Sequence, residues 1–356
     1  MATSQFGLLG NRFRGRCRHT RSRLVAAFAL GGVLFALMPA GVGATTPGQN
    51  GLIAFRVLDT EQSTSAIFTI HPDGSHETQI TFPTTSGDID TLGNWSPDGT
   101  KLVLDRHTDC GSDCGTDELY VVNADGSNPH KIATPEPSIE SPAWSADGQR
   151  IAFVMATGGV VNDLAADVSI WEIGIDGSGL RQITHPVGFQ QSEDHGVQYS
   201  PDGTRLVIER QLASCGFCPA IFTVDATDGG NVTRVSPRGL NGFDHPDWSP
   251  DGQWVIFRTQ SGRGGSSAVY VAHPDGTRLQ LILDGTRNGR TFRSSTFSPD
   301  GHQLVIAIAP GVGPDGNPDL WIGHFDGSEH IDSLTPLTRT DAFESTVRWG
   351  TAPLIP

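Results

Sequence analysis

The chain beyond residue 44 consists of short apolar runs separated by turns that contain Asp-Gly. In five places an aromatic residue precedes a Ser-Pro-Asp-Gly turn or a close variant, and a β-branched apolar run follows, as in "NWSPDGTKLVLD" at 94–105. Alternating runs rich in β-branched and aromatic residues, bounded by turn residues, are typical of strands. Helical periodicity of useful length is absent beyond residue 44. The pattern therefore predicts an all-β fold.

The turns recur at a regular interval. The aspartates of the first kind of turn are 49, 55, 49 and 49 residues apart, at Asp98, Asp147, Asp202, Asp251 and Asp300. A second Asp-Gly turn recurs in segments that begin at His71, Asn123, Gly174, Asp225, His273 and His324. A repeat of this length with four short strands is typical of a propeller blade. Proline presets φ for a tight turn and glycine accepts the left-handed conformation, so we interpret these aspartates as turn formers.

One succession of motifs recurs in each unit: "WSPDG", then "IAF" or "LVI", then a strand such as "LYVV", then "ADGS" and "QIT". It resembles the TolB-type, WD-like β-propeller repeat, and the resemblance covers residues 45–356. The resemblance implies a six-bladed β-propeller of four-stranded antiparallel blades. It does not extend to the amino-terminal domain of TolB, because the strand "GLIAF" already begins at residue 51. Since such repeats occur in binding proteins and in the non-catalytic part of some peptidases, the resemblance implies a fold rather than one function.

The two ends of the repeat region complement each other. The segment 52–81 supplies the second, third and fourth strands of a blade without a first strand, and the segment 346–350 supplies a single first strand. Pairing them completes the sixth blade and removes two exposed strand edges. We therefore expect the C-terminal strand to pair with the N-terminal strands and close the ring.

Residues 1–44 differ from the rest of the chain. They contain six arginines and no acidic residue, then an apolar run over Leu24–Met38, then small residues that include Val42 and Ala44. This order is typical of a secretory signal peptide. Cleavage after Ala44 leaves a propeller of residues 45–356 without a transmembrane domain, which predicts a secreted, envelope or periplasmic protein. The alternative is retention as a membrane anchor, although the apolar run is short for a span of about 20 residues.

Processing would make the protein strongly acidic. The whole chain has 24 Lys plus Arg and 39 Asp plus Glu, so loss of the six arginines leaves 18 basic residues and a net charge of −21. Such a surface repels phosphate backbones and excludes nucleic acid as a partner. We expect a monomer that binds a protein or a small-molecule ligand.

Beyond Cys17, four cysteines remain, in two close pairs: Cys110 with Cys114, and Cys215 with Cys218. An even number of cysteines in an exported chain predicts disulfides, and we expect each pair to be bonded locally. A redox motif or a zinc site is the alternative, but His107 is the only histidine near the first pair, which makes a thin zinc shell.

The two Asp-Gly turns of a unit close the same end of the ring, so the long connections gather at the other end. Long loops on a rigid scaffold are where binding sites usually lie. The first strand of each blade enters the central channel from this long-loop face. Charged residues four or five positions before each aromatic are therefore expected to surround the channel mouth: Asp90, Glu140, Asp194 with His195, Asp244 with His245, Arg293 and Glu344.

These side chains allow three interpretations. The first is a binding site for a basic side chain or another cation, with calcium as the metal that oxygen ligands favour, although Arg293 opposes a bare cation at the centre. The second is that they only solvate a water-filled funnel. The third is an enzyme of the lyase, lactonase or hydrolase type, with an acid–base or metal site in which Arg293 holds an anionic substrate.

The sequence favours a protein that is not an enzyme. It contains no nucleophile elbow, no HExxH motif and no α/β segment for a hydrolase domain. The prediction is an exported binding or scaffolding propeller without a bound cofactor, with the enzyme as the alternative.

Overall fold

The structure, a computed structural model, describes residues 45–353 except 85, 109–115, 133, 135–137, 158–166, 187–191, 217, 241, 261–266, 288, 310–315 and 328–330. The described part consists of strands and one short 3-10 turn, η1 (Ala213–Cys215), which confirms the all-β prediction. In this part, no helix is long and apolar enough to cross a membrane. The predicted signal peptide and the pair Cys110 and Cys114 lie outside the described residues.

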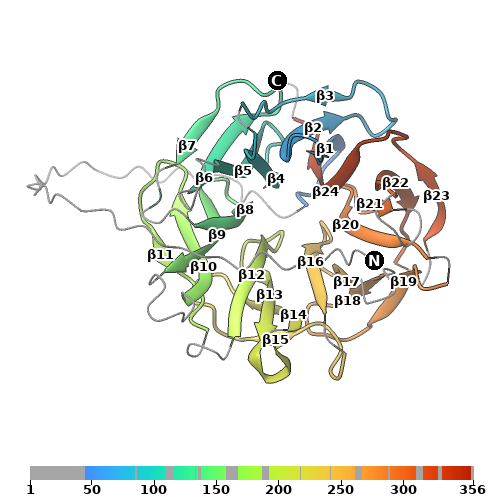
Figure 1. Cartoon of the computed structure of the whole chain (residues 1–356). Coiled ribbons are helices and arrows are strands. Elements are labelled where there is room, and N and C mark those ends of the chain that lie inside the picture. Colours follow the sequence, from blue (N-terminus) through green and yellow to red (C-terminus); the bar gives the residue numbers. More distant parts are fainter. Residues whose placement is uncertain are drawn as a thin grey trace, which may run out of the picture.

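Four sheets each contain four consecutive antiparallel strands (Figure 1). The first holds β8 (Ile139–Trp144), β9 (Arg150–Thr157), β10 (Asp167–Gly174) and β11 (Arg181–Gln182). The second holds β12 (Ser192–Tyr199), β13 (Arg205–Leu212), β14 (Cys218–Asp225) and β15 (Thr233–Arg234). The third holds β16 (Phe243–Trp248), β17 (Val255–Thr259), β18 (Ala268–Ala272) and β19 (Gln280–Asp284). The fourth holds β20 (Thr291–Phe297), β21 (Gln303–Ala309), β22 (Asp319–His324) and β23 (Asp332–Pro336).

The remaining eight strands form one larger sheet. One antiparallel group of four consists of β24 (Phe343–Thr351), β1 (Asn50–Asp59), β2 (Thr64–Ile70) and β3 (Thr78–Gln79). The other consists of β4 (Ile89–Trp95), β5 (Lys101–Thr108), β6 (Thr116–Asn123) and β7 (His130–Ile132). A single parallel pair, Ser65 with Ile89, joins the groups. Ser65 makes this junction because its backbone N–H donates to the Asp88 carbonyl and its hydroxyl to the Asp90 carbonyl.

The C-terminal strand closes the structure. As expected, β24 pairs antiparallel with β1, and Ile53 lies opposite Trp349. Figure 1 shows β4, β8, β12, β16, β20 and β24 innermost around the centre, and each contacts the next in a closed circuit. Neighbouring sheets pack face to face: Trp248 and Phe257 of one sheet share a core with Val207 of the sheet before it. Burial of this apolar surface is what holds adjacent sheets together.

The Ser-Pro-Asp-Gly segments form tight turns between the innermost strand and the next. In the turn before β5, Asp98 Oδ1 accepts hydrogen bonds from Ser96 Oγ at 2.6 Å and Thr100 N at 3.0 Å. Gly99 follows with φ +67°. The carboxylate thus organises its own turn, as interpreted from the sequence.

Several inner strands carry a bulge near the start of the strand. Residues with positive φ lie inside these bulges: Ser141 (52°), Gly196 (43°), His245 (51°) and Thr346 (40°). A bulge inserts a residue and redirects the side chains beside it. The predicted site residues Glu140, His195 and Asp244 each directly precede such a residue.

Candidate functional site

Asp90 and Asp194 are the most deeply buried of the predicted site residues. Each carboxylate is fully buried and receives two hydrogen bonds from an arginine at the paired position of the neighbouring strand. Arg106 contacts Asp90, and Arg210 contacts Asp194, at 2.5 and 2.8 Å in both pairs. Because a bidentate guanidinium compensates each charge, both carboxylates are balanced within the protein.

Asp244 has two ionisable partners. Arg258 Nε lies 3.0 Å from Asp244 Oδ1, and His245 Nδ1 lies 3.3 Å from the same oxygen. Burial favours the neutral acid, but His245 and Arg258 outweigh it and lower the pKa of Asp244. Burial, together with the Arg258 charge, lowers the pKa of His245. Asp244 is therefore the ionised member of this group, and His245 is neutral near pH 7.

Glu209 on β13 is a further candidate site residue, which the residues predicted from the first strands did not include. It lies opposite His195 in the pairing of β12 with β13. Burial raises the pKa of Glu209 to about 7; the Asp244 charge adds to the shift, and His195 and Arg258 oppose it. Burial alone would lower the pKa of His195, but the neighbouring glutamates, with Glu193 Oε2 at 3.3 Å from Nε2, raise it overall. The two side chains influence each other electrostatically, and Glu209 changes its protonation near neutral pH.

The sequence held a signal for Glu209. It stands seven residues after the turn aspartate Asp202, and Asp105 and Arg258 stand seven residues after theirs. Charged residues thus recur at this position of the second strand, where they lie beside the bulges of the first strand.

Asp105 is a further charged residue on a second strand, β5, two sheets before Glu209. Its side chain is buried, and burial, followed by the charges of Asp117 and Glu140, raises its pKa. Arg56 on β1 lies close enough to oppose this shift, while burial lowers the pKa of Arg56 itself.

Arg293 lies on the other side of the group. Its guanidinium stands over the ring of Phe343, 5.4 Å from the ring centre, which is a cation–π distance. Burial, together with the nearby Arg293 charge, lowers the pKa of Arg258. Two arginines thus face the same space.

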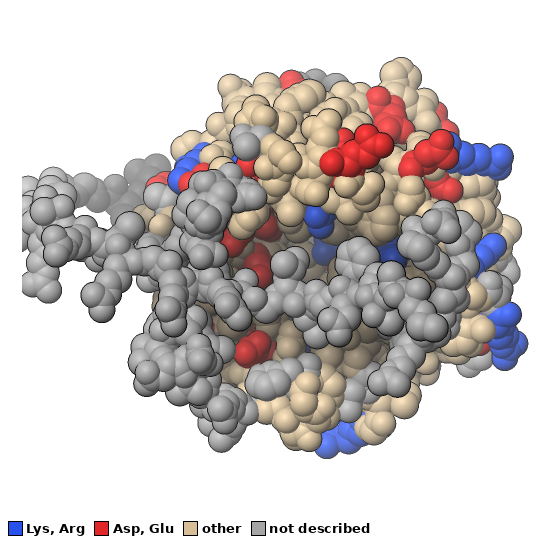
Figure 2. Space-filling model, viewed as in Figure 1, with Lys and Arg blue, Asp and Glu red and all other residues tan. Residues whose placement is uncertain are grey.

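We name these side chains the charged belt: Arg56, Asp105, Glu140, His195, Glu209, Asp244, Arg258 and Arg293. They lie on the first or second strands of successive sheets and influence one another electrostatically. Along the ring, Asp105, Glu140 and Glu209 form an acidic arc, and Arg258, Arg293 and Arg56 form a basic arc. Figure 2 shows a central hollow with acidic side chains on its left and basic side chains above and to the right. The belt therefore has two poles.

Glu344, predicted at the channel mouth, is engaged elsewhere. It is buried and accepts hydrogen bonds from the hydroxyls of Thr338 and Thr340 and from Leu320 N. Burial raises its pKa, although the two hydroxyls oppose the shift. Its carboxylate fixes the connection that leads into β24 and is not part of the charged belt.

Among the described residues, no three His, Cys, Asp or Glu side chains are arranged to hold a metal ion. Cys215 and Cys218 are paired in a disulfide with Cα atoms 5.7 Å apart, beside η1. A local bond here stiffens the connection between β13 and β14, which belongs to the long-loop end.

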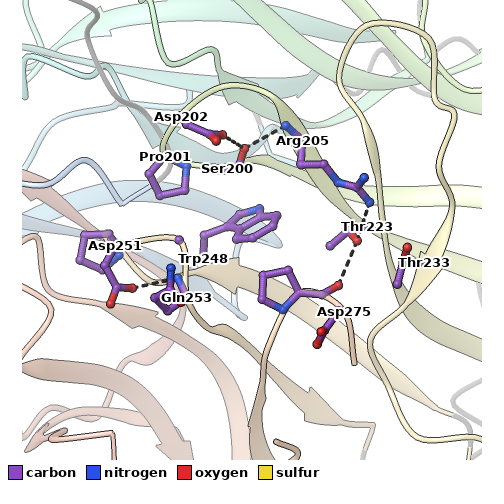
Figure 3. Close-up of a pocket in the computed structure, with 13 residues that line it drawn as sticks. Ser200, Pro201, Asp202, Arg205, Thr223, Thr233, Trp248, Asp251, Gln253 and Asp275 are labelled. Atoms are coloured by element: carbon purple, nitrogen blue, oxygen red, sulfur yellow. Dashed lines mark hydrogen bonds between the residues drawn. The ribbon is translucent and has the colours of Figure 1, made fainter. Parts of the chain in front are cut away.

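A pocket of about 480 Å³ lies at the opposite, short-turn end, between two neighbouring sheets (Figure 3). Two Ser-Pro-Asp-Gly turns and the Arg205 side chain line it. Arg205 donates to Asp225 Oδ1 and Thr223 Oγ1, both at 2.9 Å, and Thr223 Oγ1 donates to the Pro274 carbonyl at 3.1 Å. Asp202 accepts from its own turn. Because these polar groups already form hydrogen bonds with one another, they contribute little to ligand binding.

Comparison with known proteins agrees with the geometry. Residues 108–313 match the family described as the TolB beta propeller domain. Dipeptidyl-peptidase 5 of Porphyromonas gingivalis is 26% identical over an alignment of 246 residues, and the match covers 59% of this chain and 36% of that protein. The chain thus spans about a third of that relative's length.

Two solved structures share the fold. TolB from Acinetobacter baumannii has a TM-score of 0.63 at 18% identity, over 86% of this chain and 68% of that one. The putative TolB from Agrobacterium tumefaciens has a TM-score of 0.55 at 20% identity, over 85% and 99%. At these identities the likeness concerns the fold alone.

Proposed function

Because this chain belongs to the TolB β-propeller domain family, we propose that it is an exported, non-catalytic binding protein whose ligand enters the charged belt from the long-loop face. We further propose that the ring has six blades. The division of the large sheet into two antiparallel groups of four, joined only by the pair Ser65 and Ile89, supports this count.

The observation that carries the proposal is the contrast between carboxylates that are buried with an arginine partner and carboxylates that are buried or half-buried without one. Asp90 and Asp194 each have a bidentate arginine, whereas Asp105 and Glu209 have no ion pair among the described residues and have raised pKa values. Burying a carboxyl group without a cationic partner is costly, and a structural role does not require it. A cationic group from a ligand, placed in the acidic arc, would compensate both.

The basic arc suggests what else the ligand carries. Arg293 faces the same space as Arg258, whose charge Asp244 already compensates, and Arg293 has no ion pair among the described residues. A carboxylate of the ligand is the natural partner for the Arg293 guanidinium. A ligand with one basic and one acidic group would satisfy both poles. A peptide segment with a basic side chain has this chemistry, and the related P. gingivalis protein is named a dipeptidyl-peptidase.

The test is a binding assay on the processed protein with fluorescent peptides that contain arginine or lysine, against neutral peptides of equal length. Glu140→Gln and Glu209→Gln should each weaken binding of the basic peptide at least about tenfold, or about 1.4 kcal/mol. Glu61→Gln is the matched control, because Glu61 is exposed in the loop between β1 and β2 at the same end of the ring. Equal affinity of both variants and the wild type would disprove the proposal.

A second candidate function rests on the pair His195 and Glu209. A carboxyl group with a pKa of about 7 that faces a histidine has the property of a general acid or base. With Arg258 or Arg293 binding an anionic substrate, proton abstraction of the lyase type becomes feasible.

Activity assays separate the two functions. An enzyme should turn over anionic sugars or lactones, and His195→Asn should abolish turnover while leaving ligand binding within a few fold. Metal analysis adds to this: a stoichiometric ion, such as calcium, that is lost in Asp244→Asn and His245→Asn would favour the enzyme. Binding without turnover would favour the binding protein.

A further inference from the structure

The channel is closed at its short-turn end by a layer of polar side chains. Four residues before the turn aspartates, the inner strands carry Asn94, Gln198, Asp247 and Thr296, and β24 contributes Arg348. Asn94 Nδ2 donates to Gln198 Oε1 at 3.0 Å, and Asn94 Oδ1 accepts from Trp144 N at 2.7 Å. The cavity that remains is about 10 Å³, which leaves room for one water at most. We call this layer the channel floor.

Asp247 contributes a buried carboxylate to this floor, and the residue is 2% exposed. Oδ1 accepts from Trp248 N at 2.9 Å, and Oδ2 accepts from Thr296 Oγ1 at 2.8 Å and from Thr45 Oγ1 at 3.3 Å. Burial raises the pKa of Asp247, although the Arg348 charge opposes this. Among the described residues, no Lys, Arg or His nitrogen lies within 4.0 Å of an Asp247 carboxylate oxygen. The Nε donor of Arg348 is itself buried without an acceptor.

The segment that leads into β1 holds Thr45 in this position. Gly48 N donates to the Pro299 carbonyl at 3.1 Å, and Ala352 N donates to the Gln49 carbonyl at 2.8 Å. The side chain of Asn50 exchanges hydrogen bonds with Asp300. Thr45 is 5% exposed, so residues 45–50 lie across the short-turn end and bring Thr45 into the channel floor.

Thr45 is also the residue that directly follows the predicted processing site. We propose that cleavage after Ala44 creates an α-ammonium group on Thr45 that binds in the channel floor as the counter-ion of Asp247. A leader-type peptidase would break the Ala44–Thr45 amide with one water, whose hydroxyl joins the Ala44 carbonyl carbon and whose proton goes to the Thr45 nitrogen. A further proton from solvent gives the ammonium.

The charge balance of the channel floor explains why processing matters. Before cleavage the Thr45 nitrogen is a neutral amide, and Asp247 is a buried acid whose nearest cation, Arg348, acts on it from beyond ion-pair distance. After cleavage a cation forms on the same residue whose hydroxyl already touches Asp247 Oδ2. A buried ion pair of this kind, with hydroxyl and backbone donors completing the shell, requires both partners. Maturation would thus complete the channel floor.

The test uses the exported, processed protein and chemical labelling of its amines by reductive methylation at pH 7, mapped by mass spectrometry. The only lysines are Lys101 and Lys131, so three amines compete in the mature chain. A free α-amine has a pKa of about 7.7–8.0 and normally reacts faster than lysine. The proposal expects the Thr45 amine to react at least about tenfold more slowly in the wild type than in Asp247→Asn. Asp228→Asn, an exposed turn aspartate, should react like the wild type.

If Asp247→Asn fails to fold, the labelling rate of the wild-type Thr45 α-amine is measured as a function of pH. The pKa of the amine obtained from these rates then tests the inference. Burial and the charge of Arg348, the only other ionisable side chain that lines this space among the described residues, both lower the pKa of an amine. The inference requires the pairing with Asp247 to outweigh both and to keep the pKa of the Thr45 amine above about 8. An ordinary pKa of the Thr45 amine, or equal labelling in wild type and Asp247→Asn, overturns this inference and leaves the predicted processing site and the proposed function unaffected. A mature chain that begins elsewhere overturns it together with the predicted processing site, and leaves ligand binding at the charged belt testable.

Discussion

Arg210 on β13 donates two hydrogen bonds, at 2.5 and 2.8 Å, to the fully buried carboxylate of Asp194 on β12. The two residues are paired across the strands, so both side chains leave the same face of the sheet. The same arrangement recurs two sheets earlier with Asp90 and Arg106. This repeated pair fixes the start of an inner strand to its neighbour, and it removes Asp194 from the groups that are available to a ligand.

We expect Arg210→Met to destabilise the protein by about 3–5 kcal/mol, because it leaves the Asp194 carboxylate buried without its cation. Removing both charges in Asp194→Asn with Arg210→Met should recover a large part of the loss. The free energy of unfolding, measured in urea, checks both. Arg210→Met with wild-type stability would show that the carboxylate does not depend on this arginine.

Local signals in the sequence were sufficient for the strands and turns. Pro-Asp-Gly sets the turn, β-branched runs set the strands, and the unpaired first strand around 346–350 predicted the pairing of β24 with β1. The partners of the site residues depend on register instead. Asp194 meets Arg210, sixteen residues away, only because the turn and the bulge at Gly196 align β12 with β13.

Two further features were not predicted from the sequence, for different reasons. The prediction covered only the first strand of each unit, although Glu209 stands at a recurring charged position of the second strand, and its place opposite His195 depends on strand register. The joining of two groups of strands through Ser65 and Ile89 depends on how closely the groups approach, which no local pattern determines.

Glu209 predicts a pH dependence of stability. Its pKa is about 7 in the folded protein against an ordinary value of 4.5, so the folded state holds a proton that the unfolded state has lost between these values. Stability should therefore fall as pH rises from about 4.5 to about 7, by roughly 1–3 kcal/mol. In Glu209→Gln the fall should be smaller, because the raised pKa values of Asp105, Asp247 and Glu344 remain. Urea unfolding at pH 5 and pH 8 measures it, with Glu61→Gln as the control that keeps the wild-type dependence.

The same carboxyl group predicts how ligand binding depends on pH. A cationic group in the acidic arc binds the ionised form of Glu209, so affinity for a basic peptide should fall as pH drops from 8 to 6. Glu209→Gln should bind weakly at both values. Peptide titrations at the two pH values test this, and a rise in affinity at pH 6 would contradict it.

Deleting 343–356 should destabilise the whole ring. This change removes β24, leaves an edge of β1 unpaired, and exposes the core that Val347 and Trp349 share with Ile53. We expect the thermal midpoint to fall by at least about 10 °C, since each kcal/mol shifts it by about 2–4 °C in a protein of this size class. Deletion of 354–356 alone is the matched control. A normal midpoint without β24 would mean that the ring does not depend on this strand.

Gly99 and Gly177 distinguish two contributions to the loss of stability when a turn glycine is replaced. Both have positive φ, +67° and +79°, so replacement by alanine lowers the free energy of unfolding by about 1–2 kcal/mol at either site. At Gly177 an added Cβ meets nothing within 4 Å, whereas at Gly99 it meets the backbone oxygen of Thr351 at 2.0 Å. Gly99→Ala should therefore push β24 away and cost about 3 kcal/mol or more. Urea unfolding of both variants measures the difference, and equal losses would show that β24 yields at this contact without cost.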